Sequence, residues 1–158
     1  MRQMTVFYTT NGGYQMTDVT IEKLLGGRSV LGHSLETGMD RYELSRAGIP
    51  KKALLNLVSN LKVSLRSMTV LLNVTERTLQ RKRDDELLDV STSEQVIQIA
   101  EVYSRGNEVF GSFDNFQEWM NSENISFGGK KPIELLSSRY GAQMILDEVG
   151  RIEYGAFS

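Results

Sequence analysis

The spacing of apolar residues constrains the fold of this chain more than any other feature of its sequence. After Thr17, apolar side chains recur three and four positions apart, which places them on one face of a helix, whereas a half-buried strand alternates apolar and polar residues. The clearest stripes are Leu54, Leu57, Val58 and Leu61, and then Ala142, Ile145, Leu146, Val149 and Ile152. The chain is therefore predicted to be all-α.

Signals that begin and end helices divide the chain further. Helices are predicted at 17–25, 35–47 and 51–62, at 65–72 and 75–86 behind the caps Ser64 and Thr75, from a capping box at Ser91, after Asp114, at 132–137, and behind Ser138. The two prolines, Pro50 and Pro132, both stand where a helix begins. Residues 1–16 leave two alternatives, a hairpin turning at Asn11-Gly12 or a frayed terminus.

The predicted helix at 75–86 has little to bury. Leu79 is its main apolar residue, and most of its other positions carry long polar side chains, so it must project outward. Together with the helix at 65–72 and the break at Asn73-Val74, it has the layout of a helix-turn-helix, in which the first helix braces a second that enters the major groove of DNA.

Charge is distributed unevenly around that segment. From Lys62 to Arg83 there are six basic residues and one acid, a net charge of +5, so the remainder of the chain carries −7. A basic island in an otherwise acidic protein marks the place where a phosphate backbone would dock. The alternative is a solvated helix face whose charges form salt bridges with Asp84, Asp85 and Glu86.

Residue types and positions divide the predicted DNA contacts into two groups. Arg77, Gln80 and Arg81 share one helix face near its start, with Thr78 beside them, and arginine and glutamine suit direct readout of guanine and adenine. The other basic residues, Arg66, Lys82 and Arg83, are expected to contact phosphates, which supply affinity rather than sequence information.

The helix predicted from residue 94 to 110 is apolar around most of its circumference. It must be buried on more than one side, either at the centre of the domain or in a self-association surface. A homodimer would read two half-sites about 34 Å apart, and the wide apolar face of this helix is a candidate dimer surface.

Enzyme signatures are absent from the sequence. There is no cysteine, the only histidine is His33 in a glycine-flanked stretch, and no glycine pair has the sequence context of a phosphate loop. We predict no catalytic residue, cofactor or metal site, and we expect Trp119, Phe110, Phe113 and Phe116 to be core residues. The cysteine usage and the lack of an 18-residue apolar run favour a cytoplasmic protein with no export signal and no membrane span.

The C-terminal run NISFGGKKPIELLSSRYGAQMILDEVGRIEYG, residues 124–155, closely resembles the toxin-binding region of the Xre/MbcA/ParS antitoxin family. The matching positions are Asn124, Gly128, Gly129, Pro132, Leu135, Leu136, Gly141, Arg151, Ile152 and Gly155. Residues 46–58 and 76–83 are similar to the Xre-type DNA-binding part of the same antitoxins. Phe127 and Ser138 depart from the usual leucine and threonine but keep their physical roles.

The resemblance implies three regions: residues 1–45 of uncertain role, a helix-turn-helix and dimerisation region at 46–111, and a toxin-binding domain at 112–158. It also implies a type II antitoxin that represses its own operon and neutralises a toxin of the RES type, an NAD-consuming enzyme, by covering the toxin's active site with its last helix. The implied toxin-binding residues are Ile145, Glu148, Val149, Arg151, Ile152, Glu153, Tyr154 and Gly155.

Three other functions remain open at this point. The first is a stand-alone transcriptional regulator with no toxin partner, which an adjacent gene for an NAD-consuming domain would exclude. The second is a small enzyme that uses His33, and the third is a structural adaptor with no salt-dependent affinity for DNA.

Overall fold

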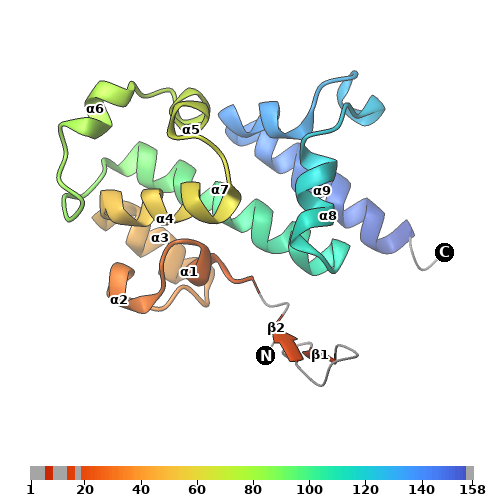
Figure 1. Ribbon diagram of the computed structural model, residues 1–158, viewed down its shortest axis with the longest axis horizontal. Helices are drawn as coiled ribbons and strands as arrows, with labels where there is room; N and C mark the ends of the chain where they lie inside the picture. Colours follow the sequence, from red (N-terminus) through yellow and green to blue (C-terminus); the bar gives the residue numbers. More distant parts are fainter. Residues whose placement is uncertain (1–5, 9–13, 17–18, 156–158) are drawn as a thin grey trace.

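A computed structural model describes residues 6–8, 14–16 and 19–155, and Figure 1 shows the order of its elements. From residue 19 onward every regular element is helical, which confirms the predicted all-α fold. The α-helices are α1 (Ile21–Leu24), α2 (Arg28–Leu31), α3 (Gly38–Ala47), α4 (Lys51–Leu61), α5 (Leu65–Leu72), α6 (Glu76–Gln80), α7 (Val90–Phe110), α8 (Phe113–Met120) and α9 (Arg139–Gly155). Two short 3₁₀-helices, η1 (Ile125–Phe127) and η2 (Pro132–Ser137), lie between α8 and α9.

The N-terminal region contains two short strands, β1 (Val6–Tyr8) and β2 (Tyr14–Met16). They pair antiparallel, with Val6 opposite Met16 and Tyr8 opposite Tyr14. Of the two alternatives for this region, the structure has the hairpin. The predicted turn at Asn11-Gly12 lies outside the described residues.

Helix α7 is the centre of the molecule. It packs against α1, α3, α5, α8 and α9 (Figure 1). Its residues Val96, Ile99, Ala100, Val102 and Tyr103 are at most 1% exposed. The wide apolar face of this helix is therefore covered within the same chain, and the prediction that it forms a dimer surface is wrong.

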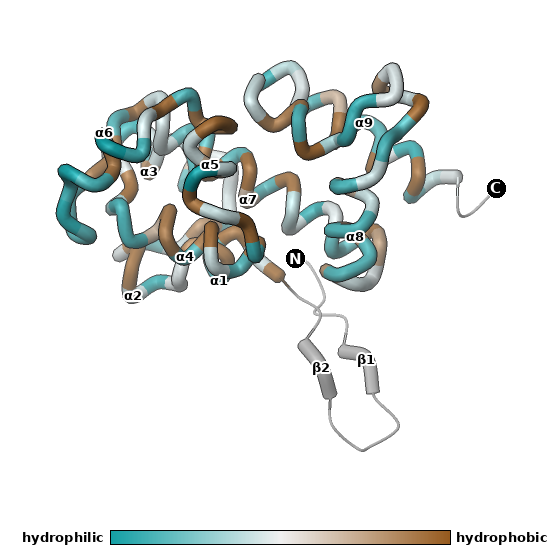
Figure 2. The backbone as a smooth tube through the Cα atoms, turned by 45° about the horizontal axis from the view of Figure 1, so that its top comes forward, coloured by the Kyte–Doolittle hydropathy of each residue, from teal (hydrophilic) through white to brown (hydrophobic). Residues whose placement is uncertain are grey.

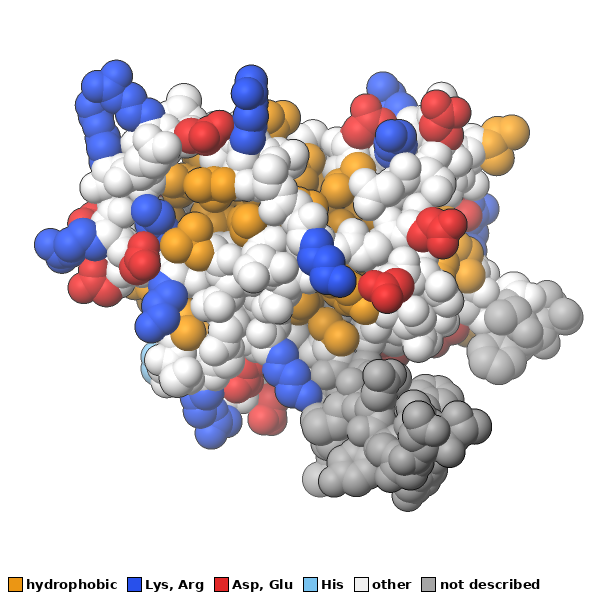
Figure 3. Space-filling model, in the orientation of Figure 1, with side chains coloured by type: hydrophobic (Ala, Val, Ile, Leu, Met, Phe, Trp, Pro, Cys, Tyr) orange, Lys and Arg blue, Asp and Glu red, His pale blue; other side chains and the backbone are white. Residues whose placement is uncertain are grey.

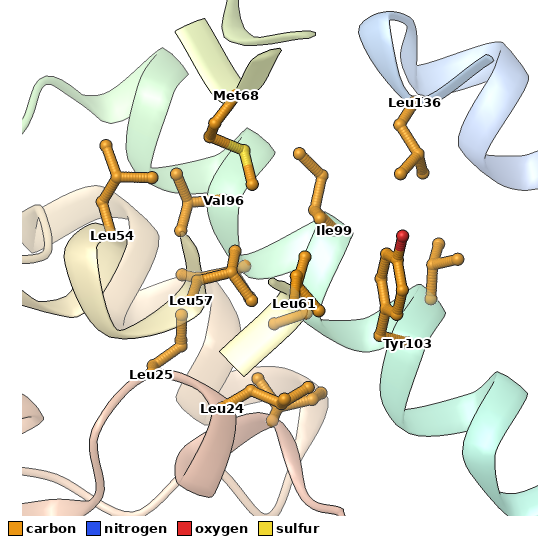
Figure 4. Packing of buried hydrophobic residues seen from close by; sticks show 14 of the residues in the cluster. Leu24, Leu25, Leu54, Leu57, Leu61, Met68, Val96, Ile99, Tyr103 and Leu136 are labelled. Atoms are coloured by element: carbon orange, nitrogen blue, oxygen red, sulfur yellow. The ribbon is translucent and has the colours of Figure 1, made fainter. Parts of the chain in front are cut away.

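The core that surrounds α7 is continuous. Leu24 and Leu25, Leu57 and Leu61 of α4, and Met68 of α5 meet Val96 and Ile99 of α7 (Figure 4). Further along, Tyr103, Phe113, Phe116, Phe110, Trp119 and Phe127 form a chain of ring contacts with centroids 5.3 to 6.1 Å apart. The prediction that Phe110, Phe113, Phe116 and Trp119 belong to the core is confirmed, with Phe116 fully buried.

Helix caps follow the sequence signals only in part. The hydroxyls of Ser64, Thr75 and Ser138 accept backbone hydrogen bonds at the starts of α5, α6 and α9, as predicted. The predicted capping box at Ser91 is wrong, because Asp89 caps α7 by accepting a 2.7 Å hydrogen bond from the Thr92 amide. Hydrogen bonding with Thr92 also lowers the pKa of Asp89. Similarly, Ser112 and not Asp114 caps α8.

The predicted helix at 75–86 is too long, since α6 ends at Gln80. The chain beyond it pairs with the start of α4: the amides of Lys51 and Lys52 donate to the carbonyls of Glu86 and Asp84 at 2.8 and 2.9 Å. Pro50, the residue before α4, provides no side-chain cap, so these carbonyls satisfy amides that a cap would otherwise bind. The pairing holds residues 84–88 out of helical conformation.

Other boundaries differ less. Helix α1 is shorter than the predicted 17–25, α2 was not predicted, and α3 begins at Gly38 behind a capping box formed by Thr37 and Asp40 rather than at residue 35.

Candidate nucleic-acid interface and the outer face of α9

Helices α5 and α6 form a tight helix-turn-helix. Asn73 ends α5 in the left-handed conformation (φ 54°), and Thr75 caps α6 two residues later. Asparagine tolerates this conformation better than most residues, which suits a sharp turn. Met68, Leu72 and Leu79 are at most 3% exposed, so one buried side chain of α6 anchors it to α5. The rest of α6 is available to solvent.

The predicted readout residues lie together on this exposed end. Arg77, Thr78 and Gln80 are exposed on α6, and Arg81 is exposed at its C-cap. Figure 2 shows α6 and the segment after it as a hydrophilic edge of the molecule, and Figure 3 shows basic side chains projecting there. The Thr78 hydroxyl shares a 2.8 Å hydrogen bond with that of Thr75. Thr78 therefore also helps to fix the start of the helix.

The structure separates the free cations of this region from the paired ones. Arg83 forms ion pairs with Asp85 and Glu86 at 3.2 and 3.7 Å, and Lys82 donates to the Leu87 carbonyl at 3.2 Å. Among the described residues, Arg77, Arg81 and Arg66 form no side-chain hydrogen bond or ion pair. The salt-bridge alternative thus describes Arg83, whereas Arg77 and Arg81 keep their guanidinium groups available for a ligand.

The residues predicted to bind a toxin are divided between two faces of α9. Ile145 and Val149 are fully buried and Ile152 is half-buried, so these three hold α9 on the core. Glu148 pairs with Arg151 and accepts a hydrogen bond from Ser126 of η1. These contacts give the buried stripe a positioning role within the chain.

The end of α9 is tied to α7 by charge. Glu153 forms an ion pair with Arg105, whose side chain is 29% exposed and which also pairs with Glu108. Desolvation lowers the pKa of Arg105, but the hydrogen bonds and charges of Glu153 and Glu108 outweigh it and raise the pKa overall. Glu153 is consequently engaged within the chain.

The outer face of α9 keeps Arg151, Tyr154 and Gly155 exposed, with Tyr154 at 78%. The same face presents Tyr140 at 86% and Met144 at 45%, neither of which the sequence analysis singled out. Their spacing was the available signal, because residues 140, 144, 151 and 154 recur at helical intervals on the side opposite the apolar stripe. Large exposed apolar side chains gathered on one helix face are typical of protein-binding surfaces.

The two regions touch directly. The Asn73 side chain in the turn of the helix-turn-helix donates to the Ser137 carbonyl of η2 at 3.5 Å, and the Gln95 side chain of α7 donates to the Leu71 carbonyl at 2.9 Å. Helix α5 also packs against η2. The helix-turn-helix and the C-terminal helices therefore form one packed body.

Sites for small-molecule chemistry are not evident in residues 6–8, 14–16 and 19–155. His33 is exposed in a bend after α2, and no cluster of three His, Asp or Glu residues in these ranges could hold a metal ion. No helix there is long and apolar enough to span a bilayer.

A short, exposed α6 braced by α5, joined to a helical domain with its own exposed face, defines a helix-turn-helix protein with a second binding region. Comparison with family models makes the class specific: residues 40–101 match the antitoxin Xre-like helix-turn-helix domain, and residues 105–155 match the antitoxin Xre/MbcA/ParS C-terminal toxin-binding domain. No curated protein matches the chain. The chain belongs to the Xre/MbcA/ParS-type antitoxins, as its resemblance predicted, and it is the antitoxin of a toxin–antitoxin pair.

Proposed function

We propose that this antitoxin neutralises an NAD-consuming toxin of the RES type and represses its own operon as a homodimer in the cytoplasm. The observation that carries the proposal is the separation of two exposed surfaces. The unpaired arginines of α6 suit DNA, and the outer face of α9 suits a protein. In this proposal residues 46–111 bind DNA and residues 112–158 bind the toxin.

Neutralisation is proposed to depend on the last turns of α9. The buried side chains Ile145 and Val149 fix the direction of the helix, and the Arg105–Glu153 ion pair fixes its end. Arg151 and Tyr154 then project from a rigid support into the mouth of the toxin's active site, where they block the entry of NAD. A rigid support favours binding because little conformational freedom is lost when the complex forms.

Repression is proposed to depend on α6. Arg77, Gln80 and Arg81 would contact base edges in the major groove, and Arg66, Lys82 and Arg83 would contact phosphates. Lys82 and Arg83 already hold the loop after α6, so their contribution to affinity is expected to be smaller than that of Arg66.

Expression of the neighbouring reading frame with and without this chain tests the proposal, with growth and cellular NAD followed together. We expect the frame alone to stop growth and deplete NAD, and co-expression to restore both. Deletion of residues 151–158 should abolish protection while DNA binding persists. A neighbouring frame without toxicity would favour a stand-alone regulator. Toxicity without loss of NAD would exclude only the assignment of the toxin to the RES type and would leave the antitoxin function in place.

A further inference from the structure

A groove on the surface crosses the boundary between the two regions. It lies between α3, α7 and the start of α9, with Arg41 and Tyr42 on one wall, Arg139 on the other, and Glu94, Ile97 and Glu101 of α7 between them. Ile97 is only 4% exposed, so the floor of this α3–α9 groove is part of the core. Neither proposed binding surface includes it.

Two charges in the α3–α9 groove have no partner. Glu94 pairs with Arg139 across it, but within the described ranges neither Arg41 nor Glu101 forms a side-chain ion pair or hydrogen bond. Both residues are half-buried. The charge of Arg41 acts on Asp40, yet that carboxylate already accepts hydrogen bonds from the amides of Thr37 and Glu36. Partly desolvated charges of this kind gain from an added counter-charge.

A large exposed aromatic side chain lines the same groove. Tyr42 of α3 is 61% exposed there, and Met39, one turn earlier on α3, is 62% exposed. Methionine, tyrosine and arginine are enriched in protein–protein interfaces. The groove and its rim therefore have the composition of a surface that another protein covers.

We infer that the α3–α9 groove is the homodimer interface and that its occupant is a second copy of this chain. A two-fold interface must complement itself, since the same patch faces itself from both sides. One unpaired cation and one unpaired anion in a single groove meet that requirement, with Arg41 of each protomer paired to the partner's Glu101. The inference rests on the proposed homodimer, and it requires neither the toxin nor DNA.

Charge reversal tests the interface. In sedimentation equilibrium of the full chain, R41E and E101R should each raise the dimer dissociation constant by about tenfold or more, because each creates two like-charge contacts per dimer. An equimolar mixture of the two variants should dimerise as tightly as the unchanged protein. In that heterodimer the side chain substituted in R41E faces the oppositely charged side chain substituted in E101R, and the unchanged Glu101 faces the unchanged Arg41. If Arg41 and Glu101 paired within one chain instead, mixing the two variants would restore nothing.

Matched controls lie on the same helix but outside the groove. R46E and E43R reverse exposed charges of α3 and should leave the dimer unchanged. Thermal unfolding of each variant separates loss of dimer from loss of fold. Single variants that dimerise normally, or a mixture that stays monomeric, would overturn the assigned surface. An unchanged protein that is monomeric would overturn the homodimer as well, while neutralisation measured by co-expression would be unaffected.

Discussion

The two exposed helices, α6 and α9, are built in opposite ways. Helix α6 spans Glu76–Gln80, has one buried anchor in Leu79, and carries unpaired arginines. Helix α9 spans Arg139–Gly155, buries a full stripe, and uses Glu148 and Glu153 in ion pairs within the chain. The comparison indicates that α6 presents charged side chains from a helix with one buried anchor, whereas α9 is held in a fixed position by a stripe of buried side chains and by ion pairs.

Removing the unpaired arginines at α6 should have the largest effect, because α6 has few other groups that could bind DNA. The double substitution R77A/R81A is expected to abolish operator binding, because two bidentate contacts with bases are together worth about 2–6 kcal/mol, at least about a 30-fold loss of affinity. Titration with promoter DNA at several salt concentrations measures the loss. R83A, which removes an arginine already paired with Asp85 and Glu86, is the control and should lose much less.

Neutralisation of the toxin should survive R77A/R81A, because neither residue touches α9. Retained DNA affinity in the double variant would contradict the assignment of α6 as the recognition helix.

Disturbing the support of α9 should have the next largest effect. A Cβ atom at position 141 would lie 2.0 Å from the Leu135 carbonyl oxygen of η2, and backbone cannot move aside cheaply. G141A is expected to cost about 1–3 kcal/mol or more in the free energy of unfolding and to weaken neutralisation. Urea denaturation and co-expression with the toxin measure the two effects.

Gly150 provides the matched control on the same helix. A Cβ atom there meets nothing within 4 Å, so G150A should keep or raise stability, by up to about 1 kcal/mol. Equal stability of G141A and the unchanged chain would show that η2 does not constrain α9.

The smallest of these effects is expected at the start of α7. D89A removes the carboxylate that caps α7 and should cost about 1 kcal/mol at pH 7. Hydrogen bonds with Thr92 hold the pKa of Asp89 in the folded state below the ordinary aspartate value of 3.8, so the cap stabilises fully above that pH and is lost as the pH falls through the folded-state pKa. The difference in free energy of unfolding between D89A and the unchanged protein, measured by urea denaturation, should therefore disappear over that acidic range. A gap that persists with the carboxylate protonated would assign the effect to packing.

Most local signals predicted the fold correctly. The caps Ser64, Thr75 and Ser138 and the stripe of α9 need only neighbouring residues to be recognised, although the caps of α7 and α8 lie two residues before the predicted Ser91 and Asp114. The larger errors arose where a distant partner decides the outcome: α6 ends early because residues 84–88 pair with Ile49 and the start of α4, and α7 is internal because α3, α8 and α9 cover it.

The candidate surfaces could likewise be predicted only where neighbouring residues carry the signal. Residue types identified Arg77, Gln80 and Arg81 because an isolated helix with few apolar residues must face solvent. Resemblance alone could not separate Ile145 and Val149 from Arg151 and Tyr154. The motif of a family contains both residues that position a helix and residues that face a partner. Burial in the folded chain makes that distinction.

The unbroken course of α7 has a consequence for how this protein can be divided. Val90–Phe110 is one helix that runs through both matched regions, with no flexible joint between them. Cleavage of the chain near residue 103 would expose buried apolar side chains on each fragment, so we expect neither fragment to be soluble by itself. The helix-turn-helix region and the toxin-binding region therefore form one folding unit, which we expect cannot be divided without loss of both.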